Sequence, residues 1–223
     1  MSFVSLSAPA AVLALALSSP AAMATTFTLD FSGNICGASG TSACGNGSTI
    51  GQNYGDVAGE LDVIYDADRD TAGTSNVFHW GSGYETLSNV AYGANGGGGL
   101  SILFQPLTGF QVTLTGFDIA PYANRERNTL VQIIDTQTNA LLVDETFAPL
   151  PTGEVTSFSG IWNSASGIQI NLGPDAWDVG ISNITGSVTR FEPPSAIPLP
   201  AAGWLMLAGL GGLAAVRRRK TTV

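Results

Sequence analysis

The sequence predicts an all-β fold, an antiparallel β-sandwich, on three observations. Glycine is abundant, at 28 of 223 residues, and turn residues separate short apolar runs. Charged residues make up 11% of the chain, against about 25% in an ordinary soluble domain, so the chain lacks the Lys, Glu and Arg that long solvent-facing helices need. Residues 110–115 and 168–172 alternate apolar and polar side chains with period two, which is typical of half-buried strands.

The expected strands share one pattern, a short apolar run bounded by turn residues. They cover residues 26–31, 60–65, 76–80, 100–104, 110–115, 130–134, 141–147, 155–159, 168–172 and 179–188. A bulge or turn is expected near Asn183, where the alternation of the last run is interrupted. The order shows no βαβ rhythm, and the glycines at 96–99 are not followed by G-K-[ST], so a phosphate-binding loop is not supported.

The first 24 residues predict a secretory signal peptide. An apolar stretch over residues 10–17 is followed by Pro20 and then by Ala22-Met23-Ala24. Signal peptidase accepts small residues at the first and third positions before the cut, so we place cleavage between Ala24 and Thr25. The absence of Lys or Arg before the apolar stretch departs from the usual pattern. A buried hydrophobic helix is the alternative, and eight apolar residues ending near a proline suit it less well.

The other end of the chain predicts a membrane helix. Residues 201–216 form an uncharged run of 16 residues, which counting from Ile197 extends to 20, about the length needed to cross a bilayer. A basic cluster follows and would stay in the cytoplasm under the positive-inside rule. The alternative is a core helix of the main domain, which the abrupt proline entry and the adjacent cations disfavour. The basic cluster comprises Arg217, Arg218, Arg219 and Lys220.

The segment before this helix carries a resemblance to a known sorting signal. Ile197, Pro198, Leu199, Pro200 and Ala201, followed by the apolar run and the basic cluster, closely resemble the VPLPA-CTERM variant of the PEP-CTERM signals of Gram-negative bacteria. This sequence departs from the signal in having Ile197 in place of Val. The resemblance implies recognition around Leu199 and Pro200 by an exosortase, an integral-membrane cysteine protease-transpeptidase. It also implies removal of the tail and delivery of the body to the cell surface or the extracellular matrix, often in bacteria that make exopolysaccharide.

The body is predicted to be a single domain between these two ends. Its stretches 112–120 and 178–184 resemble galactose-binding-like carbohydrate-binding modules, which implies a jelly-roll-like sandwich, and many such modules hold Ca²⁺ and bind sugars. The predicted organisation is a signal peptide at 1–24, a β-sandwich body at 25–192, a proline-rich linker with the sorting motif at 193–200, a transmembrane helix at 201–216 and a basic tail at 217–223.

The body is strongly acidic. Residues 25–192 carry four basic side chains against 17 acidic ones, a net charge of −13, and no lysine. Such a surface repels phosphate backbones, so nucleic acid is excluded as a partner. The densest acidic cluster contains Asp66, Asp68 and Asp70 and is a candidate Ca²⁺ site, because hard oxygen ligands suit that ion. It does not match an EF-hand, and a solvated acidic turn partly neutralised by Arg69 is the alternative.

The two cysteines, Cys36 and Cys44, are predicted to form a disulfide. An exported chain meets an oxidising compartment, and the chain holds an even number of cysteines. Their spacing of seven intervening residues does not fit the common zinc motifs. The disulfide would therefore close a loop rich in glycine and serine.

Aromatic residues are the candidate sugar-binding groups, because their apolar faces suit the C–H faces of sugar rings. Trp162 and Trp177 are singled out since turn residues lie near them in the sequence; a core position is the alternative for any one aromatic residue. The other aromatic candidates are Trp80, Tyr84, Tyr92 and Tyr122.

The sequence supports catalytic residues less well than sugar-binding ones. His79 is the only histidine and falls inside an expected strand, and G-x-S-x-G is absent, so a structural imidazole is preferred. Glu85, Glu145 and Glu154 are the carboxylates from which a glycosidase pair would have to come.

These observations predict a non-enzymatic exported β-sandwich that works at the cell surface or in the extracellular matrix and binds exopolysaccharide or another glycan. Two alternatives stay open. One is an exported hydrolase that acts on matrix polysaccharide, which would need His79 and the glutamates to converge in a cleft. The other is a purely structural matrix protein without a specific ligand.

Overall fold

The computed structural model describes residues 23–69, 73–96, 98–123 and 125–190. The predicted sorting motif, membrane helix and basic cluster lie outside the described residues, as does the predicted signal apart from Met23 and Ala24. Within the described ranges, none of the elements is a helix long and apolar enough to cross a bilayer. The described residues therefore belong to the predicted body, apart from Met23 and Ala24.

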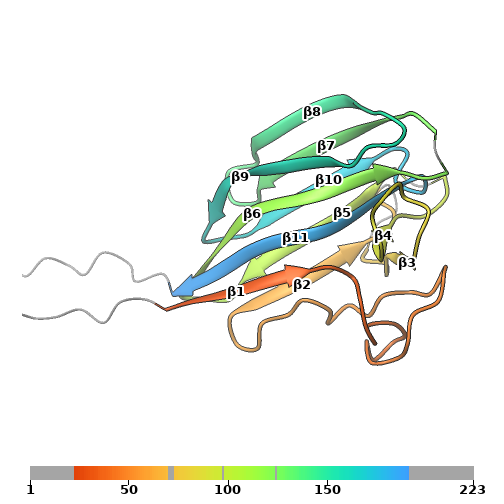
Figure 1. Ribbon diagram of the computed structural model, residues 1–223. Coiled ribbons are helices and arrows are strands. Elements are labelled where there is room, and N and C mark those ends of the chain that lie inside the picture. Colours follow the sequence, from red (N-terminus) through yellow and green to blue (C-terminus); the bar gives the residue numbers. More distant parts are fainter. Residues whose placement is uncertain (1–22, 70–72, 97, 124, 191–223) are drawn as a thin grey trace, which may run out of the picture.

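Eleven strands form two antiparallel sheets in the described part of the chain (Figure 1). The first sheet has the order β3-β4-β11-β6-β9, and β1 also pairs with β11; the second has the order β2-β5-β10-β7-β8. The predicted all-β sandwich is thereby confirmed. The strands of the first sheet are β1 (Ala24–Leu29), β3 (Phe78–Trp80), β4 (Val90–Tyr92), β6 (Phe110–Pro121), β9 (Thr156–Ser164) and β11 (Val179–Arg190). Those of the second are β2 (Leu61–Asp66), β5 (Leu100–Pro106), β7 (Arg127–Asp135), β8 (Ala140–Leu150) and β10 (Ile168–Gly173).

The core lies between the two sheets. In β6, Val112 and Leu114 are buried while Thr115 is exposed, so the alternation in the sequence is the alternation of burial. Phe27 of β1 stacks on Phe104 of β5, with ring centroids 5.7 Å apart and an interplanar angle of 15°, which joins the first sheet to the second. Other fully buried core side chains from both sheets are Leu61, Ile102, Ile119, Ile133, Ile168, Ile170, Ile181 and Ile184.

A bulge in β11 allows two strands, β4 and β1, to pair with the same edge of β11. The register of β11 against β6 shifts between Ser182 and Thr185, and Asn183 adopts a positive φ of 52°, as the sequence predicted. Before the bulge, Ile181 pairs with Ala91 of β4. After it, residues 184–189 pair with β1. The short β4 was not predicted, because its three residues are all buried and show no alternation.

The two ends of the sandwich differ in what they hold. Ala24 pairs with Thr189, so β1 begins beside the end of β11, at the left in Figure 1. The β3–β4 hairpin and the start of β11 lie at the opposite end. The chain therefore enters and leaves the described body at one end and presents the β3–β4 hairpin at the other.

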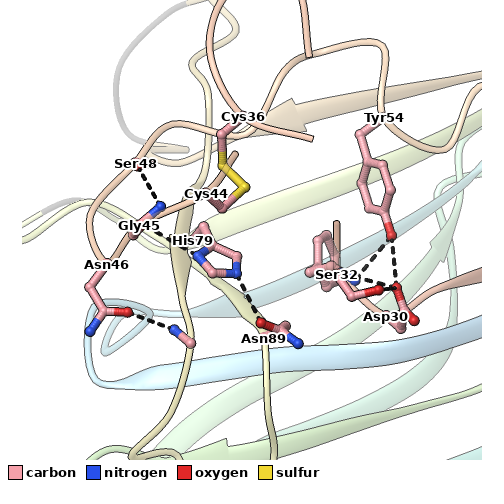
Figure 2. Close-up of a disulfide and its surroundings, with 12 residues drawn as sticks. Asp30, Ser32, Cys36, Cys44, Gly45, Asn46, Ser48, Tyr54, His79 and Asn89 are labelled. Atoms are coloured by element: carbon pink, nitrogen blue, oxygen red, sulfur yellow. Dashed lines mark hydrogen bonds between the residues drawn. A yellow bond between two sulfur atoms is a disulfide. The ribbon is translucent and has the colours of Figure 1, made fainter. Parts of the chain in front are cut away.

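The predicted disulfide between Cys36 and Cys44 is present (Figure 2). It closes the loop 36–44. The segment that follows the loop contacts β3 through backbone bonds: Gly47 N–H donates to the His79 carbonyl and His79 N–H donates to the Ser48 carbonyl, each at 2.8 Å. Asn46 Oδ1 also accepts a hydrogen bond from Gly81 N–H at 2.8 Å. The disulfide thus anchors the start of the segment 46–48, which supports the β3–β4 hairpin at the end of the sandwich.

Removing the disulfide by Cys36→Ser with Cys44→Ser is expected to lower the free energy of unfolding by about 2–3 kcal/mol, because a closed loop of this length restricts the unfolded chain by about that amount. Urea unfolding of the variant and of the reduced wild-type protein measures the loss. The reduced protein should match the variant. Equal stability of all three samples would show that the disulfide contributes nothing to the folded loop.

Candidate functional site

Five aromatic side chains converge on one hollow of about 220 Å³. They come from three segments far apart in the sequence: the β3–β4 hairpin, the turn after β6 and the turn before β11. All three segments meet at the end of the first sheet opposite the chain ends (Figure 1). We call this feature the aromatic hollow; its residues are Trp80, Tyr84, Tyr92, Tyr122 and Trp177.

The two tryptophan rings of the aromatic hollow meet tyrosine rings edge to face. The Trp80 ring lies at 80° to Tyr122, with centroids 5.6 Å apart, and at 79° to Tyr92, with centroids 6.1 Å apart. Trp177 lies at 83° to Tyr92 at 5.3 Å. Edge-to-face contacts are favourable for aromatic pairs. Tyr84 is tilted by 30° from Tyr92 and by 47° from Tyr122, so the five rings form walls in several orientations and not one flat platform.

The hollow has a buried floor and an accessible rim. Tyr84 and Tyr92 are only 2% and 3% exposed, whereas Trp177 is 40% exposed. Trp80 and Tyr122 are half-buried. An accessible cluster of large aromatic side chains on a folded domain is typical of a binding surface. The rim therefore offers apolar ring surface to a ligand while the floor holds the rings in place.

Backbone hydrogen bonds fix the turn that carries Trp177. Gly93 N–H donates to the Ala176 carbonyl at 2.7 Å, and Tyr122 N–H donates to the Asp178 carbonyl at 2.8 Å. The Tyr84 hydroxyl donates to the Trp177 carbonyl at 3.0 Å. These bonds tie the hollow's three segments to one another, so the rim is ordered before a ligand arrives, which reduces the entropy lost on binding.

A glycine allows the hairpin to approach β11 closely. A Cβ atom at Gly180 would lie 2.8 Å from Tyr84 Cδ1 and 2.7 Å from Val90 Cγ2, nearer than atoms can pack. Only a residue without a side chain lets Tyr84 lie against the start of β11. The position of Tyr84 in the floor therefore depends on Gly180.

An ion pair braces the same turn from the second sheet. Arg127, the first residue of β7, places Nη2 2.7 Å from Asp178 Oδ2 and Nη1 3.6 Å from Asp175 Oδ2. Burial raises the pKa of Asp175, although Arg127 acts in the opposite direction, and the charge of Asp178 raises it further. Arg127 thus holds both carboxylates that flank Trp177.

Arg127→Gln is expected to lower the free energy of unfolding by about 1 kcal/mol, because the pair is partly exposed and water screens much of its attraction. Urea unfolding measures the change. Arg125→Gln is the matched control, since Arg125 lies on the same connection and is exposed; it should be neutral. Equal losses in the two variants would contradict a specific brace.

Burial also raises the pKa of several tyrosines. The pKa of Tyr84 and of Tyr92 lies above its ordinary value of 10, mainly because burial disfavours the charged phenolate. Burial likewise raises the pKa of Tyr54 to about 12. In the unfolded chain these groups lose their protons near pH 10, whereas the folded protein keeps them neutral to higher pH.

Stability is therefore expected to hold below about pH 10 and to fall as the pH rises from there toward 12, since the unfolded state alone releases the protons. Thermal unfolding measured across this range tests the sign. Tyr54→Phe removes one of the groups and should reduce the slope. A melting temperature that stays constant from about pH 9 to about pH 12 would contradict raised tyrosine pKa values in the folded protein.

The structure separates the two tryptophans that the sequence singled out. Trp177 lies on the rim of the aromatic hollow, but Trp162 lies within β9 and packs on Phe117 at a centroid distance of 6.4 Å. The ring of Trp162 also covers Gly160. Turn residues near a tryptophan in the sequence thus did not distinguish a rim position from a packed one. Distance from a strand end does not separate them either: Trp162 lies two residues before the end of β9, and Trp177 lies two residues before the start of β11.

The structure gives the candidate Ca²⁺ residues hydrogen-bond roles. Asp66 Oδ1 accepts bonds from Asp68 N–H at 3.2 Å and from the Ser75 hydroxyl at 2.8 Å. Asp68 Oδ1 accepts a bond from Gly98 N–H at 3.1 Å. Asp70 lies outside the described residues. Over the described ranges no three His, Cys, Asp or Glu side chains are grouped as metal ligands, and the Ca²⁺ site stays a prediction.

The catalytic candidates do not share a cleft. His79 is buried in β3, as predicted, with Nδ1 3.3 Å from the Gly45 carbonyl and Nε2 3.3 Å from Asn89 Oδ1 (Figure 2). Glu85 belongs to the β3–β4 hairpin, at one edge of the first sheet, and Glu145 belongs to β8, at an edge of the second. Glu154 is exposed on the connection between β8 and β9. This arrangement offers no assembled acid and base among these four residues.

A second, more polar hollow of about 500 Å³ lies beside β2. Asp56 and Asp62 both line it, with Gln52 and Asn53. Burial raises the pKa of Asp56, and the charge of Asp62 adds to the rise, while a 2.8 Å hydrogen bond from Val63 N–H acts against it. Of the hollows described here, this one contains a pair of carboxylates.

Comparisons with known proteins do not identify a family for this chain. No protein-family model matches the chain, and no curated protein matches it. Among solved structures, the chain is similar to a Clostridium thermocellum endo-1,4-beta-D-xylanase 10B with CBM22-1 and GH10 modules, complexed with xylohexaose. The identity is 14%, the TM-score is 0.24, and the similarity covers 63% of this chain and 26% of that one, so the chain spans about a quarter of its length. A similarity at this TM-score carries neither the fold nor the function, which rest on the strands and the hollow described above.

Proposed function

We propose that this protein binds a glycan through the aromatic hollow and has no enzymatic activity. The observation that carries the proposal is the convergence of five aromatic side chains from three distant segments on one accessible surface. Sugar rings have apolar C–H faces that stack on aromatic rings, and the Trp and Tyr polar atoms supply hydrogen bonds. Part of the hollow's volume of about 220 Å³ is open to solvent, so a sugar ring would lie against the exposed rim at Trp177 and not inside an enclosed cavity.

We further propose that the protein is exported and sorted to the cell surface or the extracellular matrix. In this proposal the signal peptide is removed after Ala24, and an exosortase recognises the segment from Ile197 to Ala201 and removes the tail with its basic cluster. The disulfide between Cys36 and Cys44 supports an oxidising compartment. The proposed body is a jelly-roll-like sandwich.

A glycan array probed with the full-length chain tests the binding proposal. We expect binding to a restricted set of polysaccharides that Trp80→Ala weakens and Ile161→Ala does not, because Ile161 is 77% exposed on β9 and lies outside the aromatic hollow. If no glycan binds, the alternative of a purely structural matrix protein is favoured.

Intact-mass analysis of the protein released by its native cells tests the sorting proposal. The expected mature chain begins at Thr25 and lacks Arg217 to Lys220. A released chain that still carries this basic cluster would contradict processing by an exosortase.

The rival hydrolase has one observation in its favour, the hollow shared by Asp56 and Asp62. Most glycosidases act through a pair of carboxyl groups. Assay of new reducing ends after incubation with the bound polysaccharide separates the two functions. We expect no release; release that Asp56→Asn abolishes would favour the hydrolase.

A further inference from the structure

Charge narrows the class of glycan that the aromatic hollow accepts. The body has a net charge of −13 and no lysine. The connections around the hollow carry five acidic residues against two basic ones. One of the two arginines, Arg127, already pairs with Asp178 and Asp175. The acidic residues are Glu85, Glu126, Glu154, Asp175 and Asp178, and the basic ones are Arg125 and Arg127.

One of these acidic residues, Glu85, has a carboxylate oxygen that receives no hydrogen bond from the described residues. Glu85 follows Tyr84 in the β3–β4 hairpin, and its buried Oε1 accepts no hydrogen bond from the described residues. A buried oxygen of this kind normally has a partner. The Glu85 carboxylate therefore adds negative charge to the hairpin that carries three of the five aromatic side chains.

The aromatic rings of the hollow also favour a positively charged ligand. The faces of Trp and Tyr rings carry partial negative charge and attract cations placed over them. Ring surface is accessible at Trp177, which is 40% exposed, and in part at the half-buried Trp80 and Tyr122. A neutral sugar gains the stacking contact alone, whereas a cationic sugar gains the contact and the attraction.

We propose that the ligand is a glycan with free amino groups, a polymer of hexosamine units that are not N-acetylated. This inference rests on the proposed glycan binding at the aromatic hollow and names its substrate class. The C–H face of the sugar ring stacks on the rim, and the ammonium group is drawn by the acidic surroundings and the ring faces. Uronic acid polymers are repelled by the same charges.

Titration of the full-length chain with four oligosaccharides of equal length tests the proposal. The probes are oligomers of glucosamine, N-acetylglucosamine, glucose and glucuronic acid, each followed by tryptophan fluorescence at low and high salt. We expect the glucosamine oligomer to bind about tenfold more tightly than the N-acetylated one at low salt, and this advantage to shrink to about twofold near 1 M salt, where charges are screened. We expect the glucuronic acid oligomer to bind weakest.

The outcomes separate the two proposals. Equal binding of the amino and N-acetyl oligomers at both salt concentrations, or tightest binding of the glucuronic acid oligomer, overturns the charge inference and leaves glycan binding standing. Binding of none of the four overturns the charge inference, and failure on a wider array as well overturns glycan binding itself.

Two acidic residues allow a matched test by substitution. Glu126 and Glu154 are exposed on connections beside the hollow, and Val155, next to Glu154, packs against the aromatic cluster. Glu126→Gln with Glu154→Gln is expected to weaken binding of the glucosamine oligomer about threefold and to leave the N-acetylated oligomer unchanged. Glu60→Gln, at the opposite end of the sandwich next to the start of β2, is the control and should alter neither. Equal effects at both ends would contradict a local role for these charges.

Discussion

Trp177→Ala is expected to weaken glycan binding at least about tenfold while the protein stays folded. Trp177 forms the most exposed wall of the aromatic hollow, and its ring lies 5.3 Å from that of Tyr92. Removing it takes away a stacking surface and one of the perpendicular walls. Because the side chain is 40% exposed, the free energy of unfolding should fall by only about 1 kcal/mol. Isothermal titration with the bound glycan and urea unfolding measure the two effects.

Trp162→Ala is the matched control for this variant. Trp162 is also a tryptophan of the first sheet, but it packs on Phe117 and outside the aromatic hollow. Its removal should lower the free energy of unfolding by about 2–3 kcal/mol and leave the affinity of the folded protein unchanged. If Trp162→Ala reduced affinity more than Trp177→Ala, the binding surface would lie on β9 and the assignment to the aromatic hollow would be wrong.

Phe104→Ala is expected to produce the largest loss of stability, about 3–5 kcal/mol. Phe104 is fully buried in β5 and stacks on Phe27 of β1, so its ring connects the two sheets. Alanine leaves a cavity that the close-packed interior cannot fill. A change of this size lowers the melting temperature by about 10 °C in a domain of this length. Thermal and urea unfolding give the value.

Phe104→Leu provides the conservative comparison for the core. Leucine keeps most of the buried volume, so its cost should stay below about 1.5 kcal/mol. Should Phe104→Ala cost no more than Phe104→Leu, the two sheets would not share the core described here.

The sequence predicted the strands well where burial alternates. In β6 and β10 the apolar residues face the core at every second position, so the pattern alone located them. Asn183 marked the bulge of β11, because the alternation is interrupted there. The short β4 was missed, since three consecutive buried residues carry no period.

The aromatic hollow could not be predicted in the same way. Its members lie in the β3–β4 hairpin, the turn after β6 and the turn before β11, and only the order of the strands in the first sheet makes them neighbours. That order follows from long-range pairing, such as Ile181 with Ala91, which no local pattern reveals. Trp162 and Trp177 have similar neighbours in the sequence, yet one packs within a strand and the other lies on a rim.

The Asp66 cluster shows a related limit of reading charges from the sequence. Crowded carboxylates predicted a candidate Ca²⁺ site, which stays a prediction; what the sequence did not show is that Asp66 and Asp68 accept hydrogen bonds from nearby backbone and hydroxyl donors in the folded turn. Donors of this kind depend on how the chain returns on itself, here through Ser75 and Gly98. The spacing of the acidic residues alone does not contain that information.

The most direct test of glycan binding at the aromatic hollow is a titration of the full-length chain followed by the nuclear magnetic resonance signals of its tryptophan indole N–H groups. As glycan is added, the signals of Trp80 and Trp177 should shift in parallel with saturation, and that of Trp162 should stay in place. Saturable binding that shifts the Trp162 signal and leaves Trp80 and Trp177 unchanged would contradict the account.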